Sequence, residues 1–213
     1  AASDVYKRQE YTNIIIALFI AGFTIFSILY SVQPLIPAFS RHFHVNETWA
    51  SIPLSIATLT LAIAMLFFGA ISEVVGRKPI MFFSVISVSL LAIVQPFIDN
   101  FNVFLALRFI QGICLAGLPS IAMAYIGEEI SEISLPQAMG TYISGNAFGG
   151  AFGRVFTGFI ASLFGYKVGM IAVGVISLVA AVLFIFLLPS SRNFTKQRFH
   201  LCLLYTSPSP RDS

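Results

Sequence analysis

The stretch Gly69-Ala-Ile-Ser-Glu73-Val-Val-Gly76-Arg77-Lys78-Pro79 is the part of the sequence that decides the fold. It places one acid and two bases within a tight turn, and a long apolar segment flanks it on each side. An apolar segment of roughly 20 residues is long enough to cross a bilayer as a helix. The stretch therefore predicts two membrane-spanning helices joined by a short charged loop.

The composition restricts the class of protein before any other motif is considered. Apolar residues make up 57% of the 213 residues, charged residues make up 10%, and phenylalanine occupies 22 positions. A soluble domain of this length could not cover its surface with so few charges. Lysine and arginine number 12 against 9 acids, without the clustered basic face that nucleic-acid binding requires. The composition indicates a membrane protein whose partner is lipid, and not nucleic acid.

Long apolar segments with few charges recur along the chain and predict an all-α membrane protein with six transmembrane helices. Strands are excluded because a continuous apolar run of this length is helical in lipid. The expected helices are Asn13–Ser40, Trp49–Ser72, Pro79–Ile98, Phe101–Ile126, Leu135–Phe164 and Gly165–Leu188. Kinks are expected at the prolines that these helices contain, namely Pro34, Pro37, Pro53, Pro96 and Pro119.

The quoted loop resembles the signature loop between helices 2 and 3 of the major facilitator superfamily, a large family of secondary transporters. Gly69, Gly76 and Arg77 match the family pattern. Glu73 stands where the family usually has aspartate, and Val74 stands where it usually has a base. The position of the loop, directly after the second apolar segment, strengthens the resemblance.

Further motifs extend this resemblance. Arg108-Phe-Ile-Gln111-Gly112 is similar to the helix 4 motif of the family. Gly145-Asn146-Ala-Phe-Gly149-Gly150 is similar to the antiporter motif of helix 5, although Asn146 stands where that motif has proline. A likeness to the drug:proton-antiporter branch is carried in helix 1 by Tyr30, Gln33, Pro34 and Pro37.

The resemblance covers residues 13–194 and implies the N-terminal half of a fold that normally has twelve helices. Such a half holds six helices built as 3+3 inverted repeats, and its partner would be a C-terminal six-helix half that this sequence lacks. Residues 1–9 and 201–213 show no periodicity and are similar to translated adapter sequence, so we expect them to be non-native. A natural disordered tail is the alternative.

The distribution of basic residues predicts the orientation in the membrane. Short polar loops place one group of bases on one side, namely Arg77, Lys78, Arg192, Lys196 and Arg198. Arg41 and Lys167 fall on the other side. Loops rich in lysine and arginine stay in the cytoplasm. The N-terminus and the Arg77 loop are therefore expected on the cytoplasmic side of a bacterial-type inner membrane.

Polar residues inside the spans predict a substrate pathway. Arginine within a span is costly and usually faces a cavity or a partner, so Arg108 and Arg154 are the leading candidates. Gln33 falls at a similar depth, and the remaining candidates are Gln111, Asn146 and Tyr30. The expected counter-charge of Arg108 is an anionic substrate group or a carboxylate in the absent half. For Arg154, bonding to the backbone carbonyls of a broken helix is the alternative.

Acids are missing from all the expected spans. Many proton-coupled members of the family carry an acid in helix 1, where burial can raise its pKa toward neutrality. Gln33 cannot titrate. Proton coupling, which the resemblance implies, would then need a proton carrier in the absent half or a different mechanism.

The resemblance also assigns a gating role to the loop, through Gly69, Glu73, Gly76, Arg77 and Lys78. In the family, this loop makes charged and helix-terminus contacts that hold the outward-open state. Glu128 or Glu129, at the cytoplasmic end of helix 4, is expected to pair with Arg77. The alternative is that Arg77 and Lys78 only set the topology.

Glycines recur along the fifth expected helix. Gly145, Gly149 and Gly153 occupy every fourth position and so line one stripe, with Gly150 on the adjacent stripe. Small residues at this spacing let helix backbones approach closely in lipid. Tight helix packing is the expected role, and a bending point used in gating is the alternative.

The sequence offers no constellation for catalysis or metal binding. His42 and His44 lie close together but lack further ligands, so neither a metal nor a cofactor is expected. An enzyme is disfavoured because no histidine and no acid lies inside an expected span. The expected function is transport of small organic solutes, which the resemblance suggests is efflux by proton antiport. A sugar or amino-acid carrier and a stand-alone six-helix scaffold are the alternatives.

Overall fold

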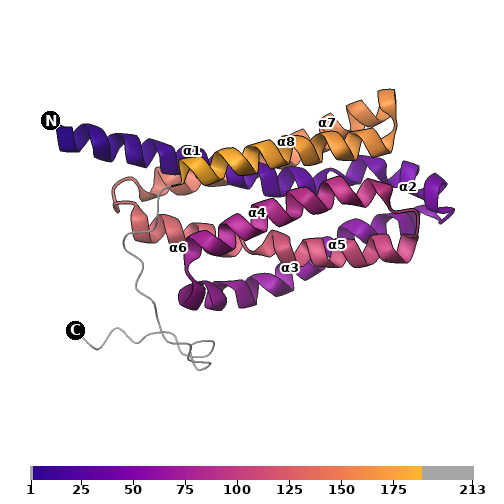
Figure 1. Cartoon of the computed structure of the whole chain (residues 1–213), viewed down its shortest axis with the longest axis horizontal. Coiled ribbons are helices and arrows are strands. Elements are labelled where there is room, and N and C mark those ends of the chain that lie inside the picture. Colours follow the sequence, from indigo (N-terminus) through magenta and orange to yellow (C-terminus); the bar gives the residue numbers. More distant parts are fainter. Residues whose placement is uncertain (1, 189–213) are drawn as a thin grey trace.

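The computed structural model describes residues 2–188 of the chain, with the side chains of Gln9 and of residues 11–188. Every element in this range is a helix. The elements are α1 (Ala2–Tyr30), η1 (Gln33–Leu35), α2 (Ile36–Phe43), α3 (Glu47–Val75), α4 (Arg77–Val94), η2 (Gln95–Phe97), α5 (Phe101–Ala116), α6 (Pro119–Glu129), α7 (Leu135–Phe164) and α8 (Tyr166–Leu187). The helices run along one common direction, and the chain reverses at each end of the bundle (Figure 1).

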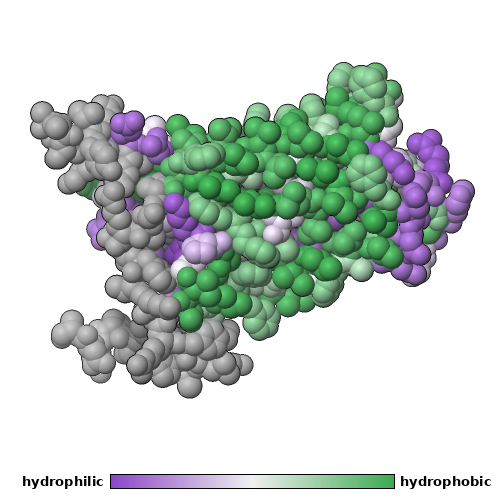
Figure 2. All heavy atoms as spheres, in the orientation of Figure 1, coloured by the Kyte–Doolittle hydropathy of each residue, from purple (hydrophilic) through white to green (hydrophobic). Residues whose placement is uncertain are grey.

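Six stretches of the described chain are long and apolar enough to cross a membrane. We number them spans 1 to 6, in the order Tyr11–Phe43, Glu47–Val75, Arg77–Phe97, Phe101–Glu129, Leu135–Phe164 and Tyr166–Leu187. Their middle parts form an apolar band, and hydrophilic residues gather toward the ends (Figure 2). The prediction of an all-α protein with six transmembrane helices is confirmed. We call the two ends of the bundle the Arg77 end and the His44 end.

Helix 1 differs from its expected bounds in two ways. α1 begins at Ala2 rather than at Asn13, since no proline or glycine interrupts the polar residues that precede the span. The helix then stops at Tyr30, and Pro34 lies in the 3-10 turn η1 that leads into α2. Proline lacks the N–H of a helical hydrogen bond and clashes with the preceding turn, which explains the break.

Proline interrupts other spans to different extents. Span 4 breaks after Ala116, and α6 begins at Pro119, where the first turn of a helix does not need the missing N–H. Pro96 lies in the 3-10 turn η2 that ends span 3. Pro53, in contrast, lies inside α3, which continues through it as one helix.

The spans pair in a symmetrical way. α1 packs most extensively against α7, α3 against α5, and α4 against α8. In span numbers, the pairs are 1 with 5, 2 with 4, and 3 with 6. Exchanging spans 1, 2 and 3 with spans 4, 5 and 6 gives the same three pairs. Spans 1 and 4, which this exchange relates, are also the two that are divided into two α-helices. Two repeats of three helices give this arrangement.

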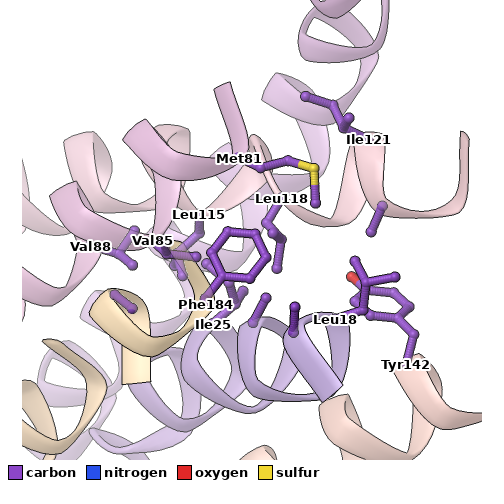
Figure 3. Close-up of a cluster of buried hydrophobic side chains, with 14 of the residues drawn as sticks. Leu18, Ile25, Met81, Val85, Val88, Leu115, Leu118, Ile121, Tyr142 and Phe184 are labelled. Carbon is purple, nitrogen blue, oxygen red and sulfur yellow. The ribbon is translucent and has the colours of Figure 1, made fainter. Parts of the chain in front are cut away.

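A cluster of buried apolar side chains fills the middle of the bundle (Figure 3). Leu18 and Ile25 of α1 belong to it, together with Met81 and Val85 of α4 and Phe184 of α8, and each of these side chains is at most 1% exposed. Lipid tails are as apolar as leucine, so burial from water does not drive helices together inside a membrane. Close packing of such side chains therefore holds the spans together and fixes the positions of the polar groups described next.

Candidate substrate and gating sites

The arginine of span 4 lies in the interior of the bundle. Arg108 is 1% exposed, and its Nη1 donates a hydrogen bond of 2.7 Å to Oε1 of Gln111. Nε2 of Gln95, in η2, donates to the same oxygen at 3.0 Å. Gln111 donates from its Nε2 to the backbone carbonyl of Val88 at 3.1 Å. This network joins spans 3 and 4 and offsets part of the cost of an arginine at membrane depth.

The surroundings of Arg108 differ from the expected ones. Among residues 11–188, no carboxylate forms an ion pair with Arg108, and its Nε has no hydrogen-bond partner. The ring of Phe104 lies 5.5 Å from its guanidinium carbon. Because Arg108 does not reach the surface of the bundle, contact with a substrate or with an acid of another half would need a rearrangement of the helices. Its role in the pathway stays a prediction.

A second group of candidates lies on the surface of spans 1 and 5. Gln33 and Arg154 are exposed, and with Pro34 they line a cavity of about 340 Å³. The guanidinium carbon of Arg154 lies 4.2 Å from the centre of the Tyr30 ring. Gly150 of α7 leaves room for this ring, since a Cβ added there would lie 3.1 Å from Tyr30 Cδ2. Gln33 and Pro34 reach this position because span 1 breaks at η1.

The predicted pathway residues therefore do not form a single cluster. Arg108 and Gln111 lie inside the bundle, while Tyr30, Gln33 and Arg154 meet at its surface. The sixth candidate, Asn146, is half-buried on α7, where its Oδ1 lies against Gly22 of α1. Residues at the same membrane depth can face different directions around the bundle, which explains the division.

The glycine stripe of α7 lies against the backbone of α1. Cβ atoms added at Gly145, Gly149 and Gly153 would collide with backbone carbonyls of α1, at 2.5 Å in the case of Gly145 and Phe19. Oγ of Ser27 also donates a hydrogen bond of 3.0 Å to the carbonyl of Gly149. Only glycine allows this approach, which brings Tyr30 and Gln33 of span 1 beside Arg154 of span 5.

The charged loop is held at the Arg77 end by an ion pair. Nη2 of Arg77 lies 2.6 Å from Oε1 of Glu128, and its Nε donates to Oε2 of the same carboxylate at 3.3 Å. Nη1 of Arg77 donates to Oγ of Ser72 at 2.5 Å. Gly76 joins α3 to α4 with a φ of 110°, which residues with a side chain rarely adopt. The loop between spans 2 and 3 is thus tied to the end of span 4.

The other predicted gating residues have separate surroundings. Nζ of Lys78 donates to the backbone carbonyl of Leu188 at 2.6 Å, which ties the loop to the end of span 6. Glu73 is half-buried and forms no ion pair or hydrogen bond within residues 11–188. Glu129 follows Glu128 at the end of α6, and the space around Gly69 is open. Of the two candidate acids, Glu128 is the partner of Arg77.

A second charged group, which the sequence analysis missed, lies at the His44 end. Oδ1 of Asp99 lies 3.2 Å from Nζ of Lys167 and 3.2 Å from Nε2 of His42. The hydrogen bond and the charge of Lys167 hold the pKa of Asp99 below its ordinary value. In the described part of the chain, no group of three or more metal-ligating side chains is found. The sequence offered one clue, the acid Asp99 in the short loop between spans 3 and 4, which lies at the same end of the bundle as Lys167.

Comparison with known proteins gives the family. Residues 16–200 match the family model described as "Major Facilitator Superfamily". The chain is 51% identical over 191 residues to the "Uncharacterized MFS-type transporter YybF" of Bacillus subtilis, which covers 90% of this chain and 47% of YybF. It is 36% identical over 185 residues to the "Inner membrane transport protein YnfM" of Escherichia coli, which covers 87% of this chain and 44% of YnfM.

A more distant relative is the "Multi-drug resistance efflux pump PmrA" of Streptococcus pneumoniae, 27% identical over 156 residues, with 71% of this chain and 39% of PmrA covered. Among solved structures, the proton:xylose symporter XylE matches with a TM-score of 0.70 at 14% identity, covering 84% of this chain and 45% of XylE. At this identity, the match shows the fold alone. The chain spans about half the length of the curated relatives it matches.

Proposed function

The chain belongs to the major facilitator superfamily, and we propose that it forms one half of a secondary transporter that exports small organic solutes by proton antiport. It is a multi-pass membrane protein of a transporter family, which agrees with the expectation that it is not an enzyme. Its coverage of about half the length of its relatives supports a second six-helix half as the partner. The relative that is named a multidrug efflux pump supports export.

One observation carries the proposal, namely an exposed arginine at membrane depth. Arg154 lies ten positions before the end of α7, which ends at Phe164, or roughly 15 Å along the helix. Exposure of its charge to lipid would be costly. We therefore expect this side of spans 1 and 5 to border a water-filled pathway and the second half. The cavity of Gln33, Pro34 and Arg154 would then form one wall of the substrate site.

The Arg77–Glu128 ion pair is the proposed gating contact. It lies within this half and ties the loop between spans 2 and 3 to the end of span 4. The pair cannot bridge two halves by itself. Its proposed role is to fix the position of the loop, so that the second half can close against it in one conformation and leave it in the other.

The proton carrier is proposed to lie in the second half. Within the described residues, the acids of spans 2 and 4 lie only in the first or last turns, as Glu47, Glu73, Glu128 and Glu129. We also propose that the Arg77 end faces the cytoplasm, because basic loops stay on that side. The name of the inner-membrane relative YnfM supports a bacterial inner membrane as the location.

The test of the proposal uses everted membrane vesicles that contain the full-length protein. A dye reports an acid-inside proton gradient, and a solute that exchanges for protons collapses this gradient. With the wild-type protein, we expect some of the solutes in a chemically varied panel to collapse the gradient. Arg154→Gln should lose the response, and Arg154→Lys should keep part of it. Protein-dependent solute flux without proton release would contradict antiport, and a wild-type response in Arg154→Gln would contradict the proposed site.

A further inference from the structure

A second and larger cavity continues from the Arg154 cavity toward the His44 end. It has a volume of about 590 Å³ and is lined by parts of η1, α2, α7 and the start of α8. Its polar lining residues are Arg41, His42, Ser162 and Tyr166. Pro34 lines both cavities, so they adjoin each other along spans 1 and 5.

The two cavities share one sign of charge. Arg41 is exposed, and within residues 11–188 it forms no ion pair. Arg154 likewise has no carboxylate partner there and lies against the Tyr30 ring. No acid is among the residues that line either cavity in the described chain. Asp99 contacts His42, which lines the larger cavity, and its carboxylate forms an ion pair with Lys167.

The remaining lining residues of the larger cavity are apolar or lack a polar side chain. Pro34, Leu35, Pro37 and Ala161 are among them, and the aromatic ring of Tyr166 also lines the cavity. A solute with a flat hydrocarbon body fits such walls, since pockets of this kind bind mainly by apolar contact and are oriented by a few polar groups. Among the polar residues that line this cavity, the permanent charge is that of Arg41, and it is positive.

We propose that the two cavities form a route for organic anions, with Arg41 receiving the carboxylate or sulfonate group near the His44 end and Arg154 receiving it deeper in the membrane. The guanidinium group suits this role because its planar donors match a carboxylate in pairs. An organic cation would meet two unpaired arginines along the same route and no acid of this half. The proposal rests on the proposed transport function and names the class of its substrate.

The experiment measures the sign of the electrostatic potential in the larger cavity, independently of transport. Ser162→Cys places a thiol in the cavity wall, in the full-length protein with Cys114 and Cys202 replaced by alanine. Thr48→Cys, which is exposed at the same end beside Glu47, is the matched control. Rates of reaction are measured in uncharged detergent with sulfonatoethyl methanethiosulfonate, an anion, and with trimethylammonioethyl methanethiosulfonate, a cation.

We call the Ser162→Cys thiol the cavity thiol and the Thr48→Cys thiol the control thiol. At low salt, we expect the ratio of the anionic to the cationic reaction rate to be about tenfold higher at the cavity thiol than at the control thiol. Arg41→Gln should lower the ratio at the cavity thiol about threefold or more, whereas Arg41→Lys should preserve it. Salt at about 1 M should remove most of the difference. Equal ratios at the two thiols, or a ratio that Arg41→Gln leaves unchanged, would overturn the proposal. An unchanged rate at the control thiol in each Arg41 variant shows that the variant is folded.

A second measurement separates charge recognition from apolar binding. We expect 2-naphthoate to slow the labelling of the cavity thiol, 2-naphthamide to have little effect, and Arg154→Gln to weaken protection by 2-naphthoate. Equal protection by both compounds would overturn the anion proposal and leave the transport proposal standing. Conversely, absence of flux in the vesicle assay together with a positive charge ratio would contradict transport and leave the anion site standing.

Discussion

Arg77, Arg108 and Arg154 lie in one apolar bundle but have three different partners. Arg77 binds a carboxylate, Arg108 binds an amide oxygen, and Arg154 lies over an aromatic ring. The first charge is compensated, so the contact can hold two elements together. The second is buried with polar but uncharged neighbours, and the third stays exposed and uncompensated. Only the third is placed to receive a solute without a change in the fold.

The Arg77–Glu128 pair gives the first prediction. Arg77→Ala should cost about 1–3 kcal/mol, because the contact is charged and partly buried. A change of this size shifts a two-state equilibrium about fivefold or more. We expect turnover of the full-length protein to change with expression intact, and Glu128→Gln to have a similar effect.

The double variant distinguishes a shared contact from two separate effects. Arg77→Ala combined with Glu128→Gln should be no worse than either single change. Glu73→Gln serves as the control, because Glu73 forms no ion pair in the described residues. Fully additive losses, measured as solute flux and as labelling of cysteines at the Arg77 end, would refute the proposed contact.

The interior network gives the second prediction. Gln111→Leu removes the oxygen that accepts hydrogen bonds from both Arg108 and Gln95. Unsatisfied buried donors cost about 1–3 kcal/mol, so the thermal midpoint of the purified full-length protein should fall by several degrees. Gln111→Glu keeps an accepting oxygen and adds a counter-charge for Arg108, but it loses the Nε2 donor to the Val88 carbonyl, so it should recover part of the stability that the leucine variant loses. Equal midpoints for the leucine variant and the wild type would show that the network contributes nothing.

The directions of these side chains could not be predicted from the sequence. A membrane helix is apolar on most faces, so an amphipathic pattern that would reveal the direction of Arg108 or Arg154 is missing. Counting residues from a loop predicts how deep a residue lies in the membrane. The sequence therefore predicted the depth of Arg108 and Arg154 but not the direction of either side chain. The contact of Arg77 with an acid at the end of span 4 was easier to anticipate, because short loops confine both partners to one end of the bundle.

At the scale of elements, proline and glycine shape the site. Pro34 ends α1 and creates η1, which carries Gln33 to the cavity, whereas α3 continues through Pro53. Proline thus ends one helix and leaves another continuous, because packing against neighbouring helices decides whether the freed backbone carbonyl is tolerated. The sequence predicted where prolines lie but could not predict which spans would break.

The contact of α1 with α7 gives the third prediction. Gly149→Ala adds a Cβ that collides with the backbone of α1, so the two helices must separate. We expect a loss of about 2 kcal/mol or more, seen as a lower thermal midpoint, together with weaker solute binding at Arg154. Gly140→Ala is the matched control on the same helix, because nothing lies within 4 Å of the added Cβ. That change should be neutral or slightly stabilising.

A similar loss in both glycine variants would point to a general effect of alanine in α7 rather than to the helix contact. A stable Gly149→Ala variant with normal solute binding would show that α1 and α7 can shift without disturbing the cavity. Either result would remove the argument that close helix packing positions Gln33 beside Arg154.

At the scale of the whole molecule, the pairing of spans is symmetrical, but the placement of the polar groups is not. Spans 1 and 4 are both broken, and each carries a polar group near its break or on the segment before it. Gln33 of span 1 faces the surface, and Arg108 of span 4 faces the interior. The number of spans and their helical nature followed from the length of the apolar segments. The pairing did not, because it depends on which small and large side chains meet across helices that the sequence separates.

The last prediction concerns the orientation of the whole bundle. Among residues 11–188, the bases near the span ends outside the bundle interior are balanced, with Arg77 and Lys78 at one end and Arg41 and Lys167 at the other. The bias comes from Arg192, Lys196 and Arg198, which the sequence places directly after span 6, on the side of the Arg77 end for an even number of spans. Since bases near span ends favour the cytoplasm, the Arg77 end should be inside.

Cysteine labelling in intact cells tests this orientation. Ile133 lies between α6 and α7 and is 95% exposed, so a cysteine placed there by Ile133→Cys should resist an impermeant thiol reagent, whereas Thr48→Cys should react. Both should react after permeabilisation. The reverse pattern would place Arg77 and Glu128 outside, and the gate proposed there would have to close the other face of the membrane.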